Sequence, residues 1–251
     1  LKNIEKLLEI YSCSFADKEI LEIGTHDGAT AYALASFGAK SVLATDIAAY
    51  YLGQTPNAKV SKDSIVKENA RLDMLRNAYV GTIDKQIADR VSFIEDDICS
   101  SSVPSQSMDI VVSWELLEHI TCPQDAFREM ARILKPGGIA FHEYNPFFSL
   151  DGGHSLCTLD FLWGHARLDN MDFKRYLEEI RPNEKDVAFS FFENNLNRMT
   201  FSHIEDYAQK SGLTMVSKLP WSSREHLQLI TPEILSQCKN IHQAVELIDL
   251  I

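Results

Sequence analysis

A short glycine-rich stretch, EIGTHDG at residues 22–28, follows an apolar run and opens onto an alanine-rich segment. This order predicts a strand, a tight turn and the start of a helix. Glycine lets the backbone approach a ligand closely, and the amides at a helix N-terminus favour carboxylate or phosphate oxygens. The acid ahead of the turn, Glu22, is of little use to a loop that binds only phosphates. The stretch therefore favours a cofactor that carries a cationic group and free ribose hydroxyls.

Acidic residues also follow the next two predicted strands. Asp46 closes the second strand, and the pair Asp96-Asp97 comes directly after the third. In a parallel sheet, ligands bind at the carboxyl ends of the strands, so we expect these carboxylates in a ligand site. A carboxylate at the tip of the second strand can accept hydrogen bonds from both hydroxyls of a ribose. We therefore expect Asp46 to be the ribose ligand.

The segments that hold these residues alternate between strand and helix, which predicts an α/β fold with a doubly wound, mostly parallel sheet. The predicted strands are 19–23, 41–45, 91–94, 109–113, 139–143, 213–218 and 226–230. The last two would pair as a hairpin at the sheet edge, which makes the sheet seven-stranded. The predicted helices are 2–13, 29–37, 64–80, one from Pro123, 202–211, and one from Pro232 with Thr231 as its N-cap. We expect the run PGG at 136–138 to end the helix from Pro123 before the fifth strand.

The alternation breaks after the fifth strand. Residues 144–200 are rich in aromatic residues, histidine and asparagine, which favours an inserted substrate cap. Residues 1–143 and 201–251 would then form the cofactor-binding domain. Residues 47–63 are too irregular for a regular element and longer than a usual strand-to-helix connection, so we expect a lid there.

Composition limits the classes of partner. The chain has 251 residues, enough for one domain with insertions, and 45% apolar and 24% charged residues are ordinary for a globular protein. Its formal net charge of -12 repels phosphate backbones. This argues against nucleic acid or an anionic membrane as the main partner and favours a small molecule. No apolar run has the length of a membrane span, and nothing in the sequence indicates an oligomeric state.

The cysteines and possible metal ligands form no recognisable pattern. The five cysteines are scattered and lack CxxC spacing, which argues against a disulfide framework or a zinc site and favours a reducing compartment, the cytoplasm. Asp151, His154 and His165 could contribute metal ligands, but their spacing matches no metal motif, so the sequence assigns no metal site and leaves metal use open. The sequence begins at Leu1 rather than methionine, which is consistent with an excised or processed piece of a chain.

Residues 19–143 resemble a class I S-adenosyl-L-methionine (SAM)-dependent methyltransferase of the small-molecule group, whose first motif is ExGxGxG. The features that carry the resemblance are, in chain order, EIGTHDG at 22–28, Asp46, DDI at 96–98 and SMDIVVSWELLEH at 107–119. The run ARILKPGG at 131–138 is similar to the family's turn into the fifth strand. Their order and spacing together make the resemblance specific.

The resemblance implies SAM as cofactor and transfer of its methyl group to an oxygen, nitrogen or carbon atom of a small metabolite. It also implies that Asp97 accepts a hydrogen bond from the adenine amine while Ile98 packs on the ring. The backbone around Gly24 would face the methionine part, with Glu22 orienting the loop or the amine. The implied cofactor-binding residues are Glu22, Gly24, Thr25, His26, Gly28, Asp46, Ile47, Asp97, Ile98 and Trp114.

His26 departs from the family pattern because it stands where the motif has its middle glycine. A bulky residue there excludes the closest backbone approach and can put an imidazole beside the cofactor. A structural role for this imidazole is favoured over a catalytic one.

Methyl transfer is an in-line displacement, so the protein supplies alignment, desolvation and, for some acceptors, a base. Our first candidate for the base is His154, because it lies in a DGGH turn at the start of the predicted cap. His119 and Glu143 are the other candidates. Contacts to the acceptor are expected from Glu115, Tyr144 and Asn145.

Two other classes of function remain open. The first is a methyltransferase-like binding or scaffold protein that has lost catalytic activity, and the departure of His26 from the motif supports it. An NAD-dependent oxidoreductase is the other alternative, because an acid about twenty residues past a glycine turn also binds an NAD ribose. The turn lacks GxGxxG, however, and the acid pair after the third strand has no role in that reading.

Overall fold

The computed structural model describes residues 2–47, 62–220 and 224–238 of the chain. Most of the lid predicted at 47–63 lies outside the described residues. Contacts divide the chain into two compact units. The first comprises Leu1–Leu116 and Asp125–Glu143, and the second comprises Leu117–Gln124 and Tyr144–Ile251.

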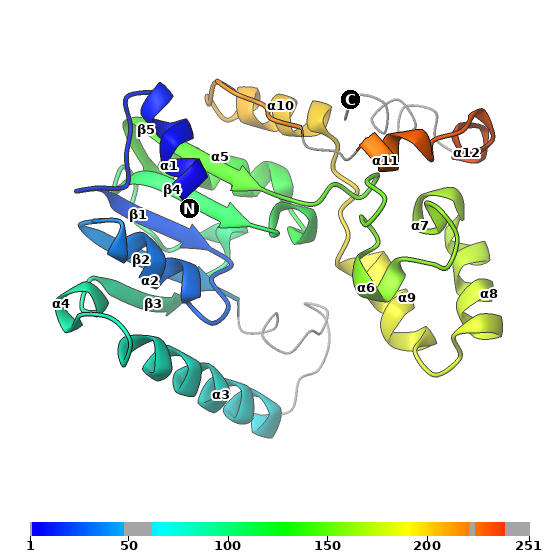
Figure 1. The fold of residues 1–251 in the computed structure, drawn as a ribbon, viewed down its shortest axis with the longest axis horizontal. Helices are drawn as coiled ribbons and strands as arrows, with labels where there is room; N and C mark the ends of the chain where they lie inside the picture. Colours follow the sequence, from blue (N-terminus) through cyan, green and yellow to red (C-terminus); the bar gives the residue numbers. More distant parts are fainter. Residues whose placement is uncertain (1, 48–61, 221–223, 239–251) are drawn as a thin grey trace. The chain divides into compact units, whose positions relative to one another are not determined.

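The first unit is built on a parallel sheet of five strands in the order β3-β2-β1-β4-β5. The strands are β1 (Glu19–Ile23), β2 (Ser41–Asp46), β3 (Val91–Glu95), β4 (Met108–Trp114) and β5 (Leu134–Glu143). Figure 1 shows their arrows pointing in one direction. Since β2 and β3 lie on one side of β1, and β4 and β5 lie on the other, the strand order reverses between β1 and β4. Ligands of such sheets bind outside the carboxyl ends of the strands at this switch point.

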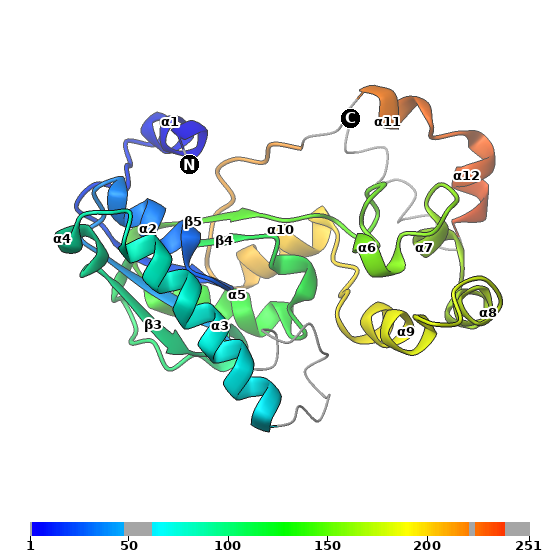
Figure 2. The same cartoon turned by 60° about the horizontal axis from the view of Figure 1, so that its bottom comes forward.

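Among the described residues, five α-helices and one short 3-10 helix accompany the sheet. They are α1 (Lys2–Ile10), α2 (Ala29–Ser36), α3 (Lys62–Val80), α4 (Lys85–Ala88), η2 (Ile98–Ser100) and α5 (Pro123–Ile133), whose first two residues belong to the second unit. Figure 2 shows α3 beside α2, with which it makes contact. Residues of the inner strands, such as Val42, Ile110 and Val112, are fully buried. Burial on both faces explains why these strands are near-continuous apolar runs.

The sheet has five strands rather than the seven predicted. Within the described residues, 213–220 form no regular element, and Val216 and Leu219 are exposed there. Residues predicted as the seventh strand lie partly in helix α11 (Arg224–Gln228) instead. Arginine, glutamate, leucine and glutamine all favour the helix, and this local preference prevails where no neighbouring strand pairs with the segment.

The fifth strand begins earlier than predicted. Helix α5 ends at Ile133 and β5 starts at Leu134, so the run PGG at 136–138 lies within the strand. The pairing with β4 jumps there from Met108–Leu134 to Ile110–Ile139. Proline has no N–H for the ladder, and Gly137 has a φ of 79°, so the strand is interrupted rather than stopped.

The second unit is helical. Its elements are η3 (Leu117–His119), α6 (His154–Cys157), α7 (Gly164–Arg167), α8 (Asn170–Ile180), α9 (Lys185–Asn194), α10 (Phe201–Lys210), α11 and α12 (Pro232–Gln237). Figure 2 shows α8 beside α9, and the stacked rings of Phe173 and Phe192, 4.0 Å apart, join these helices. Phe147, Phe148 and Trp163 complete an aromatic core. None of the described helices is both long enough and apolar enough to cross a bilayer.

Candidate functional site

The turn after β1 is bound to the neighbouring strand. The backbone N–H groups of Gly24 and Thr25 both donate to the carbonyl of Thr45, at 2.8 and 3.0 Å. Gly24 has a φ of 74°, and a Cβ there would lie 2.9 Å from a methyl group of Leu116. Gly28, with a φ of 84°, leaves only 2.6 Å between its missing Cβ and the ring of Phe93. Both positions therefore require glycine.

Glu22 lies beneath this turn with only 3% of its surface exposed. The hydroxyl of Thr25 donates to its Oε2 at 2.7 Å. Burial raises the pKa of Glu22 to about 7, and the nearby carboxylate of Asp46 acts in the same direction. The carboxyl group is therefore poised to ionise next to a cation.

Asp46 ends β2 and is also buried, with 4% exposure. Its Oδ2 accepts a hydrogen bond from the N–H of His26, and its Oδ1 accepts one from the N–H of Ile47, each at 2.8 Å. Burial raises the pKa of Asp46, while these two hydrogen bonds lower it. Each carboxylate oxygen has a second lone pair, so both can still accept a ligand hydroxyl.

His26 adopts the conformation of the glycine that it replaces, with a φ of 48°. Its carbonyl accepts from Nη2 of Arg76 at 3.0 Å, and its Nε2 lies 3.3 Å from Nη2 of Arg71. Both arginines belong to α3. The side chain therefore contacts α3, while the backbone N–H serves Asp46.

The two acids after β3 differ in their environments. The carboxylate of Asp96 accepts hydrogen bonds from the hydroxyl of Ser101 and from the N–H and hydroxyl of Ser102, at 2.6 to 2.8 Å. Asp97 is exposed and caps η2 by accepting from the N–H of Cys99 at 2.9 Å. The carboxylate of Asp97 accepts fewer of these hydrogen bonds than that of Asp96, so more of its lone pairs can accept from a ligand. Ile98 beside it is buried.

Three predicted residues meet at the ends of β4 and β5. Trp114 pairs with Glu143 across the two strands, and the N–H of Glu115 donates to the Glu143 carbonyl at 2.8 Å. Both glutamate side chains are exposed. Glu115 has a φ of 47°, an uncommon conformation for this residue type. The chain therefore turns sharply as it leaves β4.

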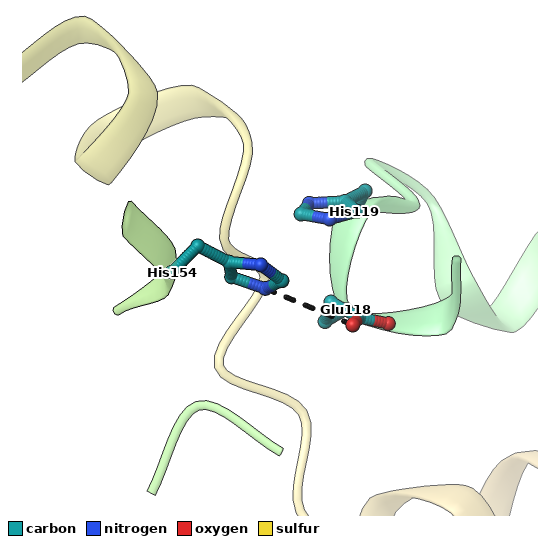
Figure 3. A group of neighbouring side chains, drawn as sticks. All are labelled: Glu118, His119 and His154. Carbon is teal, nitrogen blue, oxygen red and sulfur yellow. Dashed lines mark ion pairs between the residues drawn. The ribbon is translucent and has the colours of Figure 1, made fainter. Parts of the chain in front are cut away.

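In the second unit, His119 and His154 lie together, with ring centroids 4.7 Å apart (Figure 3). Nε2 of His154 lies 3.7 Å from Oε1 of Glu118, a carboxylate with 2% exposure. Burial lowers the pKa of His154, so its neutral form is favoured. Glu118 was absent from our predicted site, although its position next to His119 directly after β4 is a signal that the sequence contains.

Asn145 joins this cluster through its backbone, whose N–H donates to Oε1 of Glu118 at 3.0 Å. Its side-chain oxygen accepts from Ser149 at 2.6 Å. Tyr144 instead packs edge-on against Phe201, with ring centroids 5.9 Å apart. His165 points elsewhere too, since its Nε2 donates to the carbonyl of Phe147 at 2.8 Å.

Comparison with known proteins identifies the region that contains the sheet. Residues 21–142, from β1 to β5, match the sequence profile of the family described as "Methyltransferase domain". The match covers just under half of the chain and supports a class I SAM-dependent methyltransferase domain in these residues. Phosphoethanolamine N-methyltransferase 2 of Haemonchus contortus, solved with SAM, shares the fold with a TM-score of 0.50. It is 20% identical, and the match covers 84% of this chain and 36% of that one.

Two curated relatives of the methyltransferase domain are ubiquinone/menaquinone biosynthesis C-methyltransferases, named UbiE. The protein of Ectopseudomonas mendocina (strain ymp) is 26% identical over 139 residues, which cover 52% of this chain and 54% of that protein. The protein of Pseudomonas paraeruginosa (strain DSM 24068 / PA7) is 26% identical over 149 residues, or 56% and 58% of the two chains. The chain thus spans little more than half the length of either relative.

The cofactor of the methyltransferase domain is SAM. The residues present fit it, because Glu22 and Asp46 place two buried carboxylates at the switch point, where a cationic, ribose-bearing ligand is expected. A Cβ at Gly24 would close the space beside Leu116. The methyltransferase domain therefore offers both the charge and the close backbone approach that the sequence predicted.

Proposed function

We propose that the chain methylates an oxygen, nitrogen or carbon atom of a small metabolite, with SAM as the methyl donor. The observation that carries this proposal is the carboxylate of Asp46, held at the tip of β2 by the N–H of His26 and the N–H of Ile47. A carboxylate fixed in this way is ready to accept both hydroxyls of a ribose.

The other cofactor contacts that we propose follow from the same end of the sheet. Asp97 and Ile98 would hold the adenine, by a hydrogen bond to its amine and by packing on its ring. The backbone of Gly24 would face the methionine part, above Thr25 and the buried carboxyl of Glu22. The remaining contacts would come from His26, Gly28, Ile47 and Trp114.

SAM, when bound, supplies a methyl group that its sulfonium already activates for in-line displacement. The chain's own residues then need only align the acceptor, exclude water and, for an acceptor that must lose a proton, provide a base. That base stays a prediction: His154, His119 and Glu143 are the candidates. Contacts to the acceptor from Glu115, Tyr144 and Asn145 stay predictions as well.

Residues 144–200 are proposed to cover the acceptor, with residues 1–143 and 201–251 as the remainder of the enzyme. This region is rich in aromatic side chains, which favours a bulky organic acceptor over a very small one. The UbiE relatives are named as C-methyltransferases and the Haemonchus protein as an N-methyltransferase. We therefore propose that a quinone-type ring carbon and a primary amine are the first acceptors to test.

The scattered cysteines, none of which forms a disulfide, favour a reducing compartment. The net charge of -12 favours a partner other than nucleic acid or an anionic membrane.

A titration followed by a turnover assay tests the proposal. Calorimetry with SAM, with its demethylated product and with NAD is expected to show saturable binding of the first two only. Incubation with SAM and each acceptor class is then expected to release the demethylated product in amounts that depend on the acceptor. SAM binding without any turnover across the panel favours a scaffold protein, and NAD binding favours an oxidoreductase.

A further inference from the structure

The second unit contains a group of three side chains with the composition of a metal site. Glu118 and His119 come from η3, and His154 begins α6. Figure 3 shows the two rings and the carboxylate turned toward one another. One possible ligand atom of each residue lies within 4.8 Å of those of the other two.

The hydrogen bond of His119 fixes which of its nitrogens can bind an ion. Its Nδ1 lies 2.7 Å from the backbone carbonyl of Asn195. A carbonyl only accepts, so Nδ1 carries the proton, and in the neutral ring Nε2 is the nitrogen that bears a lone pair. Ligating histidines commonly donate their other ring N–H to a carbonyl in this way, which orients the ring and raises the basicity of the ligand.

The other two side chains are held as firmly. The N–H of Asn145 donates to Oε1 of Glu118 and so positions the carboxylate. Nε2 of His154 is buried and makes no hydrogen bond with any described residue, so it can bind an ion. The ring of Phe191 packs against both imidazoles, at 5.8 and 6.0 Å. His154 has a φ of 51°, a conformation that directs its ring and that persists only where the surroundings impose it.

We propose that Glu118, His119 and His154 bind a divalent transition-metal ion, of which Zn²⁺ suits the donor set best. Two imidazole nitrogens and one carboxylate oxygen are a common ligand set for zinc, with a fourth position left for water or another ligand. Mg²⁺ and Ca²⁺ prefer oxygen ligands, so this site discriminates against them.

The distances require a small adjustment on binding. Zinc bonds of about 2.0 to 2.2 Å in tetrahedral geometry place the donor atoms about 3.3 Å apart. The Glu118–His154 pair, at 3.7 Å, is already near this separation. No two of the ligand atoms lie more than 4.8 Å apart. Side-chain rotations that move the ring nitrogens of His119 and His154 by at most about 1.5 Å therefore bring all three atoms to zinc-binding separations.

Metal binding and the predicted base role exclude each other at Nε2 of His154, because a nitrogen that ligates an ion cannot accept a proton. The proposal can be tested separately from methyl transfer, since all three ligands lie within one unit and metal binding can be measured without SAM.

Calorimetric titration of chelator-treated protein with ZnCl₂, alone and with MgCl₂ as a comparison, tests the proposal. We expect one Zn²⁺ per chain and no saturable Mg²⁺ binding. Titration with Co²⁺ reports on the ligands, because a nitrogen and oxygen site gives visible d–d absorption without the near-ultraviolet band of thiolate ligation. This distinction is needed because the chain has five free cysteines.

Two variants remove ligands while preserving the local structure. Glu118→Gln keeps the oxygen that accepts from Asn145 but loses the charge. His154→Asn places in the left-handed conformation a residue that tolerates it. Loss of a second-shell partner alone lowers metal affinity about 10- to 100-fold, so each variant is expected to lose at least about 100-fold.

His203→Gln and Cys122→Ser are the matched controls. His203 is exposed and completes the capping box of α10, a role that glutamine also fills. Both controls are expected to bind Zn²⁺ as the wild type does. The proposal is overturned if the wild type shows no saturable Zn²⁺ binding, if both ligand variants bind Zn²⁺ as tightly as the wild type, or if Co²⁺ gives the thiolate band. Calorimetric titration of the same samples with SAM tests the proposed function independently of Zn²⁺ binding.

Discussion

The backbone N–H of His26 donates to Oδ2 of Asp46 at 2.8 Å, although 20 residues separate them in the sequence. This bond ties the turn after β1 to the tip of β2, so the two parts of the cofactor site are positioned before any ligand binds. A carboxylate that is already oriented loses less freedom when it accepts a ribose.

Because the backbone of His26 makes this bond, its imidazole is expected to be dispensable for cofactor binding. His26→Gly keeps the N–H, and glycine adopts the positive φ without strain. We predict that calorimetry finds SAM affinity within about threefold of the wild type, a difference below 1 kcal/mol. A loss of more than about tenfold would show that the imidazole itself contacts the cofactor.

Glu22 is expected to make folding stability depend on pH. Its folded pKa of about 7 exceeds the ordinary value of 4.5 for a glutamate, so the neutral carboxyl stabilises the fold at low pH. This contribution is complete below the unfolded pKa and is lost as pH rises through about 7. Relative to Glu22→Gln, the wild type is predicted to lose about 2–3 kcal/mol of unfolding free energy between pH 5 and pH 8. Urea denaturation of both proteins across this range measures the difference.

Glu19→Gln is the control for this experiment. Lys135 and Lys40 lower the pKa of Glu19, so its contribution is present above the unfolded pKa and is lost as pH falls. Its substitution is expected to change stability by a constant amount between pH 5 and pH 8. Parallel stability curves for the wild type and Glu22→Gln would contradict the assignment of Glu22.

The close approach at Gly28 is expected to be required for stability. Gly28→Ala forces a non-glycine residue to a φ of 84° and places its Cβ 2.6 Å from the ring of Phe93. Gly137→Ala carries a similar backbone strain, with a φ of 79°, but has no described neighbour within 4 Å. We predict that Gly28→Ala lowers the unfolding free energy by about 2 kcal/mol more than Gly137→Ala does, since overpacking costs about 1–3 kcal/mol. Equal effects in thermal or urea unfolding would show that the ring moves aside freely.

The first unit was largely predictable from sequence because its strands are apolar on both faces and each ends at a chemically distinct residue. Ile23 leads into the glycine turn, and Asp46 closes β2 as predicted. The interruption of β5 at 136–138 was not predictable from local signals, since a proline and two glycines also end a helix. Only the pairing with β4 determines that the strand continues through them.

The second unit was harder to predict because its contacts join residues far apart in sequence. The pattern of 226–230 resembled a strand, yet without a partner its helix-forming residues prevail. Glu118 was overlooked because His154, its neighbour in space, lies 36 residues further along the chain. His119 and His154 were both predicted as site residues, and their proximity emerges only from the fold.

The most direct test of the account is the affinity of Asp46→Asn for SAM. Asparagine has nearly the same shape but loses the charge and one of the two acceptor oxygens, and hydrogen bonds to charged groups contribute about 1.5–3 kcal/mol. Calorimetry is therefore predicted to show an affinity about 10- to 150-fold weaker than that of the wild type. Asp89→Asn, an exposed substitution outside the site, is expected to leave the affinity unchanged. Undiminished SAM affinity in a correctly folded Asp46→Asn protein would contradict the proposed cofactor site.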